Sequence, residues 1–164
     1  SGQGALCGFV WHSAGARRWL FWKAAEENGW RIAQEIVWVK NALVFGRADY
    51  QWRHEPCLYL KREGAPRQDD RTQTTVWEVN KPTDSMHPTQ KPVDLFMIPI
   101  RNHTDMGGIV YEPFSGSGTT LIACENLGRR CRAVEIAPGY VAVALERWHV
   151  HTGKTPELIP NETT

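Results

Sequence analysis

The sequence has almost no excess of charge of either sign. Its 164 residues carry 19 Lys and Arg against 18 Asp and Glu, which gives a formal net charge of +1. Such a balance does not by itself indicate a nucleic-acid-binding protein, so any attraction to a polyanion has to come from local clusters of Lys and Arg. With 41% hydrophobic residues, the chain is expected to form one globular domain over residues 1–152, followed by a polar tail over 153–164.

Cysteines are also few. The four cysteines (Cys7, Cys57, Cys124 and Cys131) include no C-x-x-C pair, and only His54 lies at a ligand-like spacing from one of them. Free thiols, most of them buried, are therefore favoured over disulfides or a zinc site. The residues also contain no secretory signal pattern and no apolar run long enough to span a membrane. These absences are typical of a protein of the reducing cytoplasm.

The stretch that ends at Glu135 predicts a strand, a glycine-rich loop, a helix and a second strand. Residues 108–111 are typical of a short strand buried in a parallel sheet, and the sequence E-P-F-S-G-S-G-T-T follows. A helix is expected from about Thr119, with Gly128 as its stop. The second strand then runs to Glu135. This arrangement is half of a nucleotide-type binding site.

The loop of this unit is a candidate ligand site. Gly116 and Gly118 allow a sharp turn and a close approach of the backbone to a ligand. A P-loop needs a lysine after its second glycine, where this chain has Thr119, and the dinucleotide fingerprint needs a third glycine, where it has Leu121. Both phosphate-binding interpretations are therefore disfavoured.

An acidic residue stands at the tip of each strand of the unit. A carboxylate at Glu112 would repel a phosphate but suits an ammonium group. Glu135 is placed to accept hydrogen bonds from both hydroxyls of a ribose. Because S-adenosylmethionine brings a ribose and an amino group without a phosphate, the pattern favours it as the cofactor.

Two motifs carry a resemblance to a known family. E-P-F-S-G-S-G-T-T, from Glu112, resembles the cofactor-binding motif of DNA amino-methyltransferases, and H-P-T-Q-K-P, from His87, resembles the motif that accompanies it. The pair in this order is highly specific. With segments 37–40 and 53–57, the resemblance to phage-type adenine-N6/cytosine-N4 DNA methylases covers nearly the whole chain. One departure is visible, since the family usually has Asp where Glu112 stands.

The resemblance implies a Rossmann-like α/β fold, with a mostly parallel sheet and helices on both faces. It also implies transfer of a methyl group from S-adenosylmethionine to an exocyclic base amine of double-stranded DNA, as in restriction-modification, in a bacterial or phage-infected cell. Adenine N6 is the preferred acceptor and cytosine N4 the alternative, and the amine would attack the sulfonium methyl directly. The implied cofactor-binding residues are Thr89, Gln90, Lys91, Glu112, Pro113, Phe114, Gly116, Ser117, Gly118, Thr119 and Glu135.

Segment 41–56 is the candidate DNA-facing loop. It combines cationic and aromatic side chains: Arg47, Tyr50, Trp52, Arg53 and His54. Guanidinium groups neutralise phosphates, and flat rings stack on an unpaired base. The alternative is a structured turn with buried aromatics; the residues alone favour neither, and the resemblance favours DNA. A second candidate DNA-facing loop, 62–85, carries Arg71.

The rest of the chain predicts strands and helices around these segments. Strands are expected over 5–11, 30–40, 57–60 and 76–79. Helices are expected over about 14–28, from about 89 to a kink or end at Pro99, and from Pro138 onward. Trp19 and Trp22, on the first of these helices, are expected to pack in the core.

The motif that holds the target amine is absent from these residues. The family holds the exocyclic amine with an Asp/Asn/Ser-Pro-Pro-aromatic tetrapeptide, whose ring stacks on the flipped base. No such tetrapeptide occurs in the sequence, so none of its residues is predicted to be catalytic. In family members of this motif order, the tetrapeptide precedes the point where this chain starts and follows a strand beside that of 108–111. The chain is therefore expected to lack the central strand of the sheet.

Two functions stay open from the sequence. The chain either takes part in DNA methylation together with an N-terminal segment, a second polypeptide or a second copy that supplies the missing strand, or it is a catalytically incomplete fragment that acts as a DNA- or protein-binding module. No metal is expected in either case. A partner that supplies the Pro-Pro motif would distinguish the two.

Overall fold

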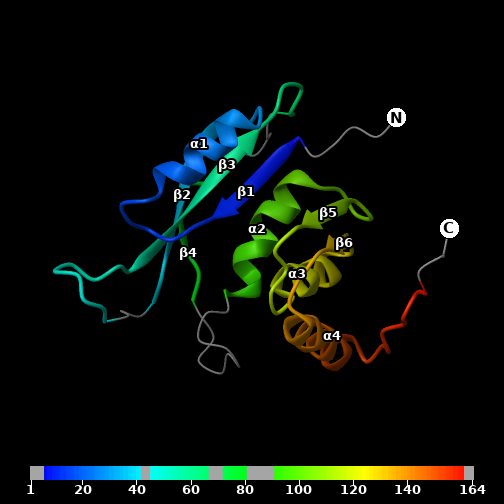
Figure 1. Cartoon of the computed structure of the whole chain (residues 1–164). Coiled ribbons are helices and arrows are strands. Elements are labelled where there is room, and N and C mark those ends of the chain that lie inside the picture. The colour runs from blue at the N-terminus through cyan, green and yellow to red at the C-terminus, as the bar shows by residue number, and fades with distance from the viewer. Residues whose placement is uncertain (1–5, 42–44, 67–71, 81–90, 161–164) are drawn as a thin grey trace. The chain divides into compact units, whose positions relative to one another are not determined.

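The computed structural model describes residues 6–41, 45–66, 72–80 and 91–160 (Figure 1). The chain divides into two compact units, Ser1–Met86 and His87–Thr164, and each is described by itself. Three of the predicted site residues, Arg71, Thr89 and Gln90, lie outside the described residues. Within the described ranges, no helix combines the length and the apolar character needed to cross a membrane.

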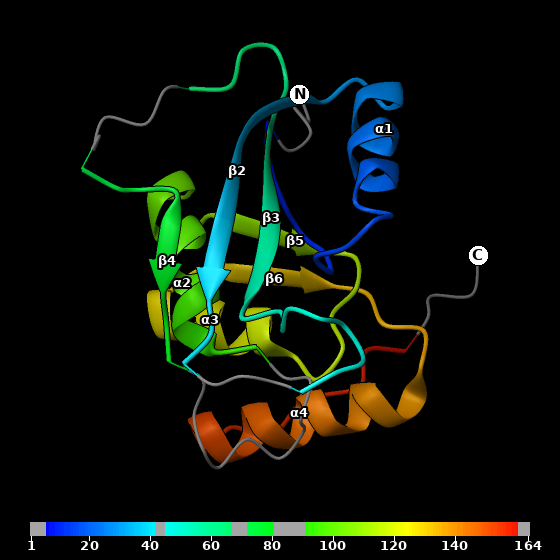
Figure 2. The same ribbon diagram turned by 90° about the vertical axis from the view of Figure 1, so that its left-hand side faces the viewer.

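The first unit contains a four-stranded sheet with one helix alongside it (Figure 2). Its strands, in the spatial order β1-β3-β2-β4, are β1 (Cys7–Trp11), β2 (Arg31–Val39), β3 (His54–Lys61) and β4 (Val76–Glu78). β3 pairs antiparallel with β1 and with β2, and β4 pairs parallel with β2. The antiparallel pairs differ from the mostly parallel sheet that the resemblance implies, because β2 returns directly into β3 without a crossover helix.

The helix of the first unit, α1 (Trp19–Glu27), is shorter and less buried than expected. It begins at Trp19 because the residues before it form a turn, in which Arg18 donates its backbone N–H to the Gly15 carbonyl. The helix contributes only Ala25 to the core, where this residue meets Leu58 and Leu60 of β3.

The expectation that Trp19 and Trp22 pack in the core is wrong. Their side chains are 56% and 42% exposed. Trp22 donates its indole N–H to Glu26 on the outer surface of the helix. The sheet therefore receives the small Ala25 instead of the large aromatic rings.

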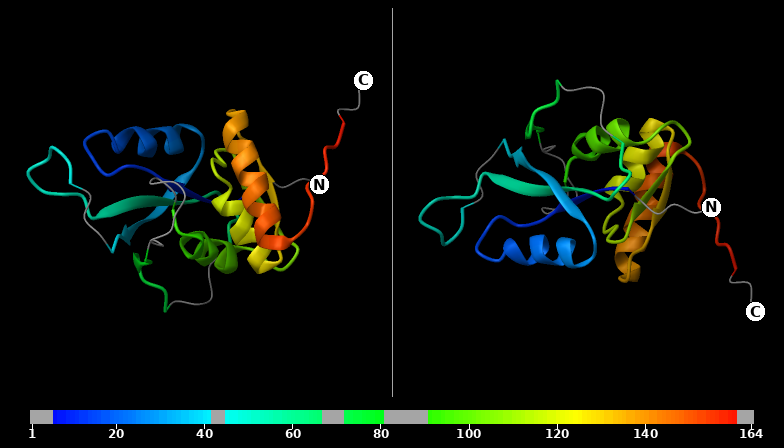
Figure 3. Two further views of the ribbon diagram at one scale, coloured as in Figure 1. Left: turned by 90° about the horizontal axis from the view of Figure 1, so that it is seen from below. Right: turned by 90° about the horizontal axis from the view of Figure 1, so that it is seen from above.

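The second unit is built around a β-α-β segment. β5 (Ile109–Glu112) and β6 (Arg130–Ala133) pair in parallel, and α3 (Thr119–Leu127) connects them. Two further helices, α2 (Val93–His103) and α4 (Pro138–Thr152), both pack against α3 (Figure 3). The core of this unit contains Ile100, Ala123 and Cys124. The strand, loop, helix and strand thus follow one another as the sequence predicts, and α3 ends before Gly128.

The sequence predicts that helix α2 kinks or ends at Pro99. The helix continues through this proline to His103, so Pro99 does not end it. The buried side chains of Leu95, Pro99 and Ile100 lie on its inner face. Packing in the core outweighs the one backbone hydrogen bond that the proline cannot donate.

The position of Gly118 allows α4 to approach the loop after β5. Gly118 has φ +79°, and a Cβ atom at this position would lie 2.8 Å from the Cβ of Ala144 on α4. Such a distance is shorter than any ordinary contact, and Ala144 has no longer side chain that could swing aside. Glycine is therefore required here both by the backbone conformation and by the neighbouring helix.

We expect the Gly118→Ala variant to lose about 2 kcal/mol or more of unfolding free energy, from left-handed strain together with overpacking. The matched control is Gly153→Ala, because Gly153 has φ +71° and nothing within 4 Å of its Cβ position. The control should lose only the left-handed cost of about 1 kcal/mol. Urea unfolding of both variants measures the difference, and equal losses would mean that α4 can move away from the loop at no cost.

One edge of the small sheet has no partner strand among the described residues of the second unit. β5 pairs with β6 along its other edge only. Ile109 and Tyr111 on β5 are 55% and 63% exposed. Two strands form a marginal sheet, and an unpaired edge is a template for association with another chain.

The isolated chain is therefore expected to associate or aggregate through β5 at micromolar concentration. Ile109→Lys should reduce this association, since a lysine on an edge strand opposes pairing. The control is Val134→Lys, which places the same charge at a side chain that is 53% exposed and lies beyond β6. Light scattering distinguishes the outcomes: a stable wild-type monomer would contradict association.

Candidate functional site

The loop between β5 and α3 is held by backbone hydrogen bonds to the end of β6. Ser115 donates its N–H to the Val134 carbonyl at 3.1 Å, and Val134 donates to the carbonyl of Glu112 at 2.9 Å. Within the loop, Gly118 donates to Ser115 at 3.0 Å and closes a tight turn. The strand ends thus determine the path of segment 113–118.

Glu112, at the end of β5, is bonded to this loop through both carboxylate oxygens. Oε1 accepts the backbone N–H of Phe114 at 3.0 Å, and Oε2 accepts the hydroxyl of Thr120 at 2.8 Å. Thr120 is buried at the start of α3. Because each carboxylate oxygen has two lone pairs, Glu112 keeps capacity for a further cationic donor.

Glu135, just beyond β6, contacts the same loop. Its Oε2 accepts the backbone N–H of Gly116 at 2.8 Å, and its Oε1 accepts that of Ala137 at 2.9 Å. The N–H groups of Ala137 and Gly116 hold the pKa of the Glu135 carboxyl below its ordinary value. The carboxylate is therefore ionised at neutral pH. The structure brings Glu112, Gly116 and Glu135 to one loop, as the sequence predicts.

Arg147 on α4 is a contact of the loop that the sequence analysis missed. Its guanidinium Nη1 donates to the backbone carbonyl of Ser117 and to the Ser117 hydroxyl, the latter at 3.1 Å. Burial lowers the pKa of this guanidinium from its ordinary value. The available signal was the helical spacing of Ala144 and Arg147, which puts both on one face of α4. The partner residue, 30 positions away, could not be read from that spacing.

The other residues predicted to bind the cofactor lie in different environments. Pro113 and Phe114 are exposed on the loop, while Thr119 is buried as the first residue of α3. Lys91 is half-buried near the start of α2. Thr89 and Gln90 lie outside the described residues, so the predicted contribution of the H-P-T-Q-K-P motif remains a prediction.

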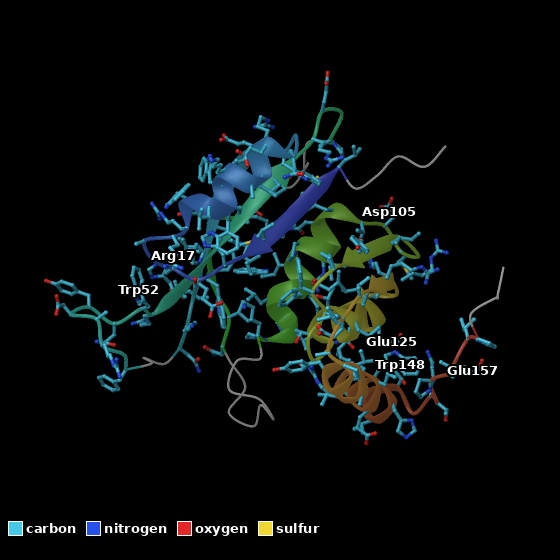
Figure 4. All side chains as sticks on the ribbon, viewed as in Figure 1. Arg17, Trp52, Asp105, Glu125, Trp148 and Glu157 are labelled. Carbon is cyan, nitrogen blue, oxygen red and sulfur yellow. The ribbon has the colours of Figure 1, made fainter. Side chains whose placement is uncertain are left out.

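The aromatic side chains of the candidate DNA-facing loop are exposed in the first unit. Tyr50 is 90% and Trp52 49% exposed, so the alternative of a turn with buried aromatics is wrong for this segment. Trp52 is labelled in Figure 4. The neighbouring Phe45 is also exposed, at 85%, although the sequence analysis did not include it. Exposed rings of this kind are free to stack on another flat group.

The side chain of Gln51 makes two hydrogen bonds within this loop. Its side-chain carbonyl accepts the N–H of Gly46, and its amide donates to the carbonyl of Ala48, both at 2.6 Å. At the base of the loop, Lys40 and Glu55 form an ion pair at 2.7 Å. Residues 46–51 of this loop are therefore held together by hydrogen bonds of one side chain.

The predicted DNA-facing residues are only partly on this loop. Arg47 and Arg53 are exposed on it, whereas His54 is the first residue of β3. The His54 ring lies edge-on to Trp52, with the ring centroids 5.4 Å apart. Strand pairing extends β3 to His54 because this residue pairs with Val39 of β2. Arg71 lies outside the described residues.

Comparison with known proteins identifies the family. A family model described as DNA methylase matches residues 2–146. The type II methyltransferase M.XycI of Xanthomonas campestris pv. cyanopsidis is 31% identical over 144 residues, which cover 79% of this chain and 48% of that protein. M.SmaI of Serratia marcescens is 27% identical over 146 residues, with 79% of this chain and 50% of that protein covered. The chain thus spans about half the length of these curated relatives.

A solved structure agrees with this assignment. The crystal structure of the M1.HpyAVI-SAM complex superposes with a TM-score of 0.73 at 28% sequence identity, covering 87% of this chain and 74% of that one. The Rossmann-like fold of S-adenosylmethionine-dependent methyltransferases is thereby confirmed. By sequence and by fold, the chain belongs to the DNA methylase family of N6- and N4-methyltransferases.

Proposed function

We propose that this chain binds S-adenosylmethionine and takes part in methyl transfer to an exocyclic amine of double-stranded DNA, with adenine N6 preferred over cytosine N4. The observation that carries the proposal is the geometry of the loop 113–118. The carboxylates of Glu112 and Glu135 accept hydrogen bonds from backbone N–H groups of this loop. The structure of M1.HpyAVI contains this cofactor, and M.XycI and M.SmaI are named type II methyltransferases.

The residues at the loop fit the cofactor. At Gly116, which has φ +52°, nothing lies within 4 Å of the Cβ position, so a ligand can reach the backbone there. Glu112 retains acceptor capacity for an ammonium group and Glu135 for two hydroxyls of a ribose. When bound, S-adenosylmethionine supplies an electrophilic methyl group on its sulfonium. We assign contacts with it to the predicted residues of the loop and to Glu135.

The first unit supplies the proposed DNA contacts. Arg47 and Arg53 would neutralise phosphates, and Tyr50 and Trp52 present flat surfaces on which an unpaired base can stack. Gln51 holds residues 46–51 by hydrogen bonds before DNA binds, which reduces the conformational entropy lost on binding.

The acceptor site requires residues that the chain does not contain. No Asp/Asn/Ser-Pro-Pro-aromatic tetrapeptide is present in the sequence, and one edge of β5 has no partner strand among the described residues of its unit. We therefore propose that a further segment, a second polypeptide or a second copy supplies a strand beside β5 and the group that holds the amine. The alternative is a catalytically incomplete DNA- or protein-binding module, and it would be favoured by the failure of any such addition to give methylation.

The first test of this proposal concerns Glu135. Glu135→Ala should weaken S-adenosylmethionine binding by about tenfold or more, because hydrogen bonds to a charged group contribute more than neutral ones. Isothermal titration calorimetry measures the affinity, with Glu146→Ala as the control, since Glu146 is an exposed acid on α4. Equal affinities of wild type and Glu135→Ala would remove Glu135 from the site.

A second test concerns DNA. Arg53→Ala should lower the affinity for duplex DNA and reduce the slope of log affinity against log salt by about one, because one phosphate contact releases about one counterion. Arg101→Ala, at an exposed arginine of α2, is the control and should leave the slope unchanged. If Arg53→Ala instead lowers the melting temperature and keeps the wild-type slope, its role is structural.

A further inference from the structure

In the loop between β5 and α3, successive residues of the Ser115–Gly118 segment are held by different parts of the second unit. The N–H of Gly116 is bonded to Glu135. The carbonyl and hydroxyl of Ser117 are bonded to Arg147, and Gly118 lies against Ala144. Two of these three contacts come from one face of α4, which the proposed cofactor chemistry does not otherwise use.

We propose that Arg147 is a positioning residue for cofactor binding, which holds the Ser117 peptide so that the N–H of Gly116 stays on Glu135. The proposal rests on the proposed function of the loop. The Ser117 carbonyl belongs to the peptide that joins Ser117 to Gly118, and the Gly116 N–H belongs to the peptide two places before it, so only the backbone dihedral angles of Gly116 and Ser117 separate the two held groups. Fixing the Ser117 carbonyl therefore limits the orientations open to Gly116 and Gly118, both of which have positive φ and no side chain to restrain them.

Helix α4 and the residues after it also contact α3 without Arg147. Trp148 on the same helix donates its indole N–H to Glu125 of α3 at 3.2 Å (Figure 4), and Glu125 also pairs with Lys154 at 2.7 Å. These contacts lie on α3 and beyond α4, away from the Ser117 peptide. Because α4 has this separate attachment, the bonds from Arg147 act on the loop itself.

An arginine suits this role better than a lysine. Both bonds come from one guanidinium nitrogen, Nη1, whose two hydrogens lie in a fixed plane, so the carbonyl and the hydroxyl of Ser117 are reached without rotation of the donor group. A part-buried cation also needs hydrogen-bond acceptors, and Ser117 provides two of them. Among the described residues, Arg147 forms no ion pair with Glu112 or Glu135.

The direct test measures amide hydrogen exchange of the loop in the chain without cofactor. Arg147→Met keeps most of the apolar stem and removes every donor. We expect exchange of the amides of residues 116–118 to accelerate by about tenfold or more, as expected for the loss of a hydrogen bond to a charged group. Amides of α3 and α4 should keep wild-type exchange rates.

The matched control is Arg129→Met. Arg129 is also a part-buried arginine of the second unit that donates to a backbone carbonyl, that of Thr104 at 2.7 Å, but it does not contact the loop. A purely structural role for Arg147 would give both variants the same loop exchange. That result would overturn the proposal, and so would wild-type protection of the loop in Arg147→Met.

A binding measurement then connects the loop to the cofactor. Arg147→Met should weaken S-adenosylmethionine binding by about tenfold, since a disordered loop must be ordered on binding, whereas Arg129→Met should bind as wild type does. Arg147→Lys should give intermediate affinity and intermediate loop exchange, and it decides the question if the Met variant does not fold. Absence of binding in wild type would contradict the proposed function instead, and the exchange data would still decide the role of Arg147.

Discussion

The close contact between Gly118 and Ala144 is the constraint on which the second unit depends. A Cβ atom at Gly118 would lie 2.8 Å from that of Ala144, so α4 can approach the loop only where a side chain is missing. This approach brings Arg147, one helical turn further along α4, to the carbonyl of Ser117. The close packing of Gly118 and Ala144 thereby places Arg147 within hydrogen-bonding distance of the loop.

The loop between β5 and α3 contacts two acidic side chains and one basic side chain, and these form no ion pair with one another among the described residues. Glu112 and Glu135 accept hydrogen bonds from N–H groups of the loop, and Arg147 donates to a carbonyl and a hydroxyl. Both N–H and C=O groups of the loop are thus held by side chains, while the carboxylates keep acceptor capacity for a ligand. A direct ion pair would have consumed that capacity, so the backbone contacts are compatible with the proposed binding of a cationic amine and a diol.

Local signals made the β5-α3-β6 segment predictable from the sequence, and nonlocal packing made other features unpredictable. Glycines, a short apolar run and two terminal acids determine the strand, loop and helix within a few neighbouring residues. The contact between Arg147 and Ser117 spans 30 positions, and no local pattern reports it. The exposure of Trp19 and Trp22 was missed for the same reason, because only the packed sheet shows that Ala25 is the residue that α1 buries.

The proposed contacts with the cofactor and the proposed contacts with DNA lie in different units of this chain. Every contact described for the Ser115–Gly118 segment belongs to the unit His87–Thr164. The loop that contains Tyr50 and Trp52, with its hydrogen bonds from Gln51, belongs to the unit Ser1–Met86. A change in one loop should therefore leave the internal hydrogen bonds of the other intact. Under the proposed function, methylation needs both sets of contacts together with a group that holds the amine, so binding of the ligands and methyl transfer are separate steps. This separation is the physical reason that binding and catalysis have to be measured independently for this protein.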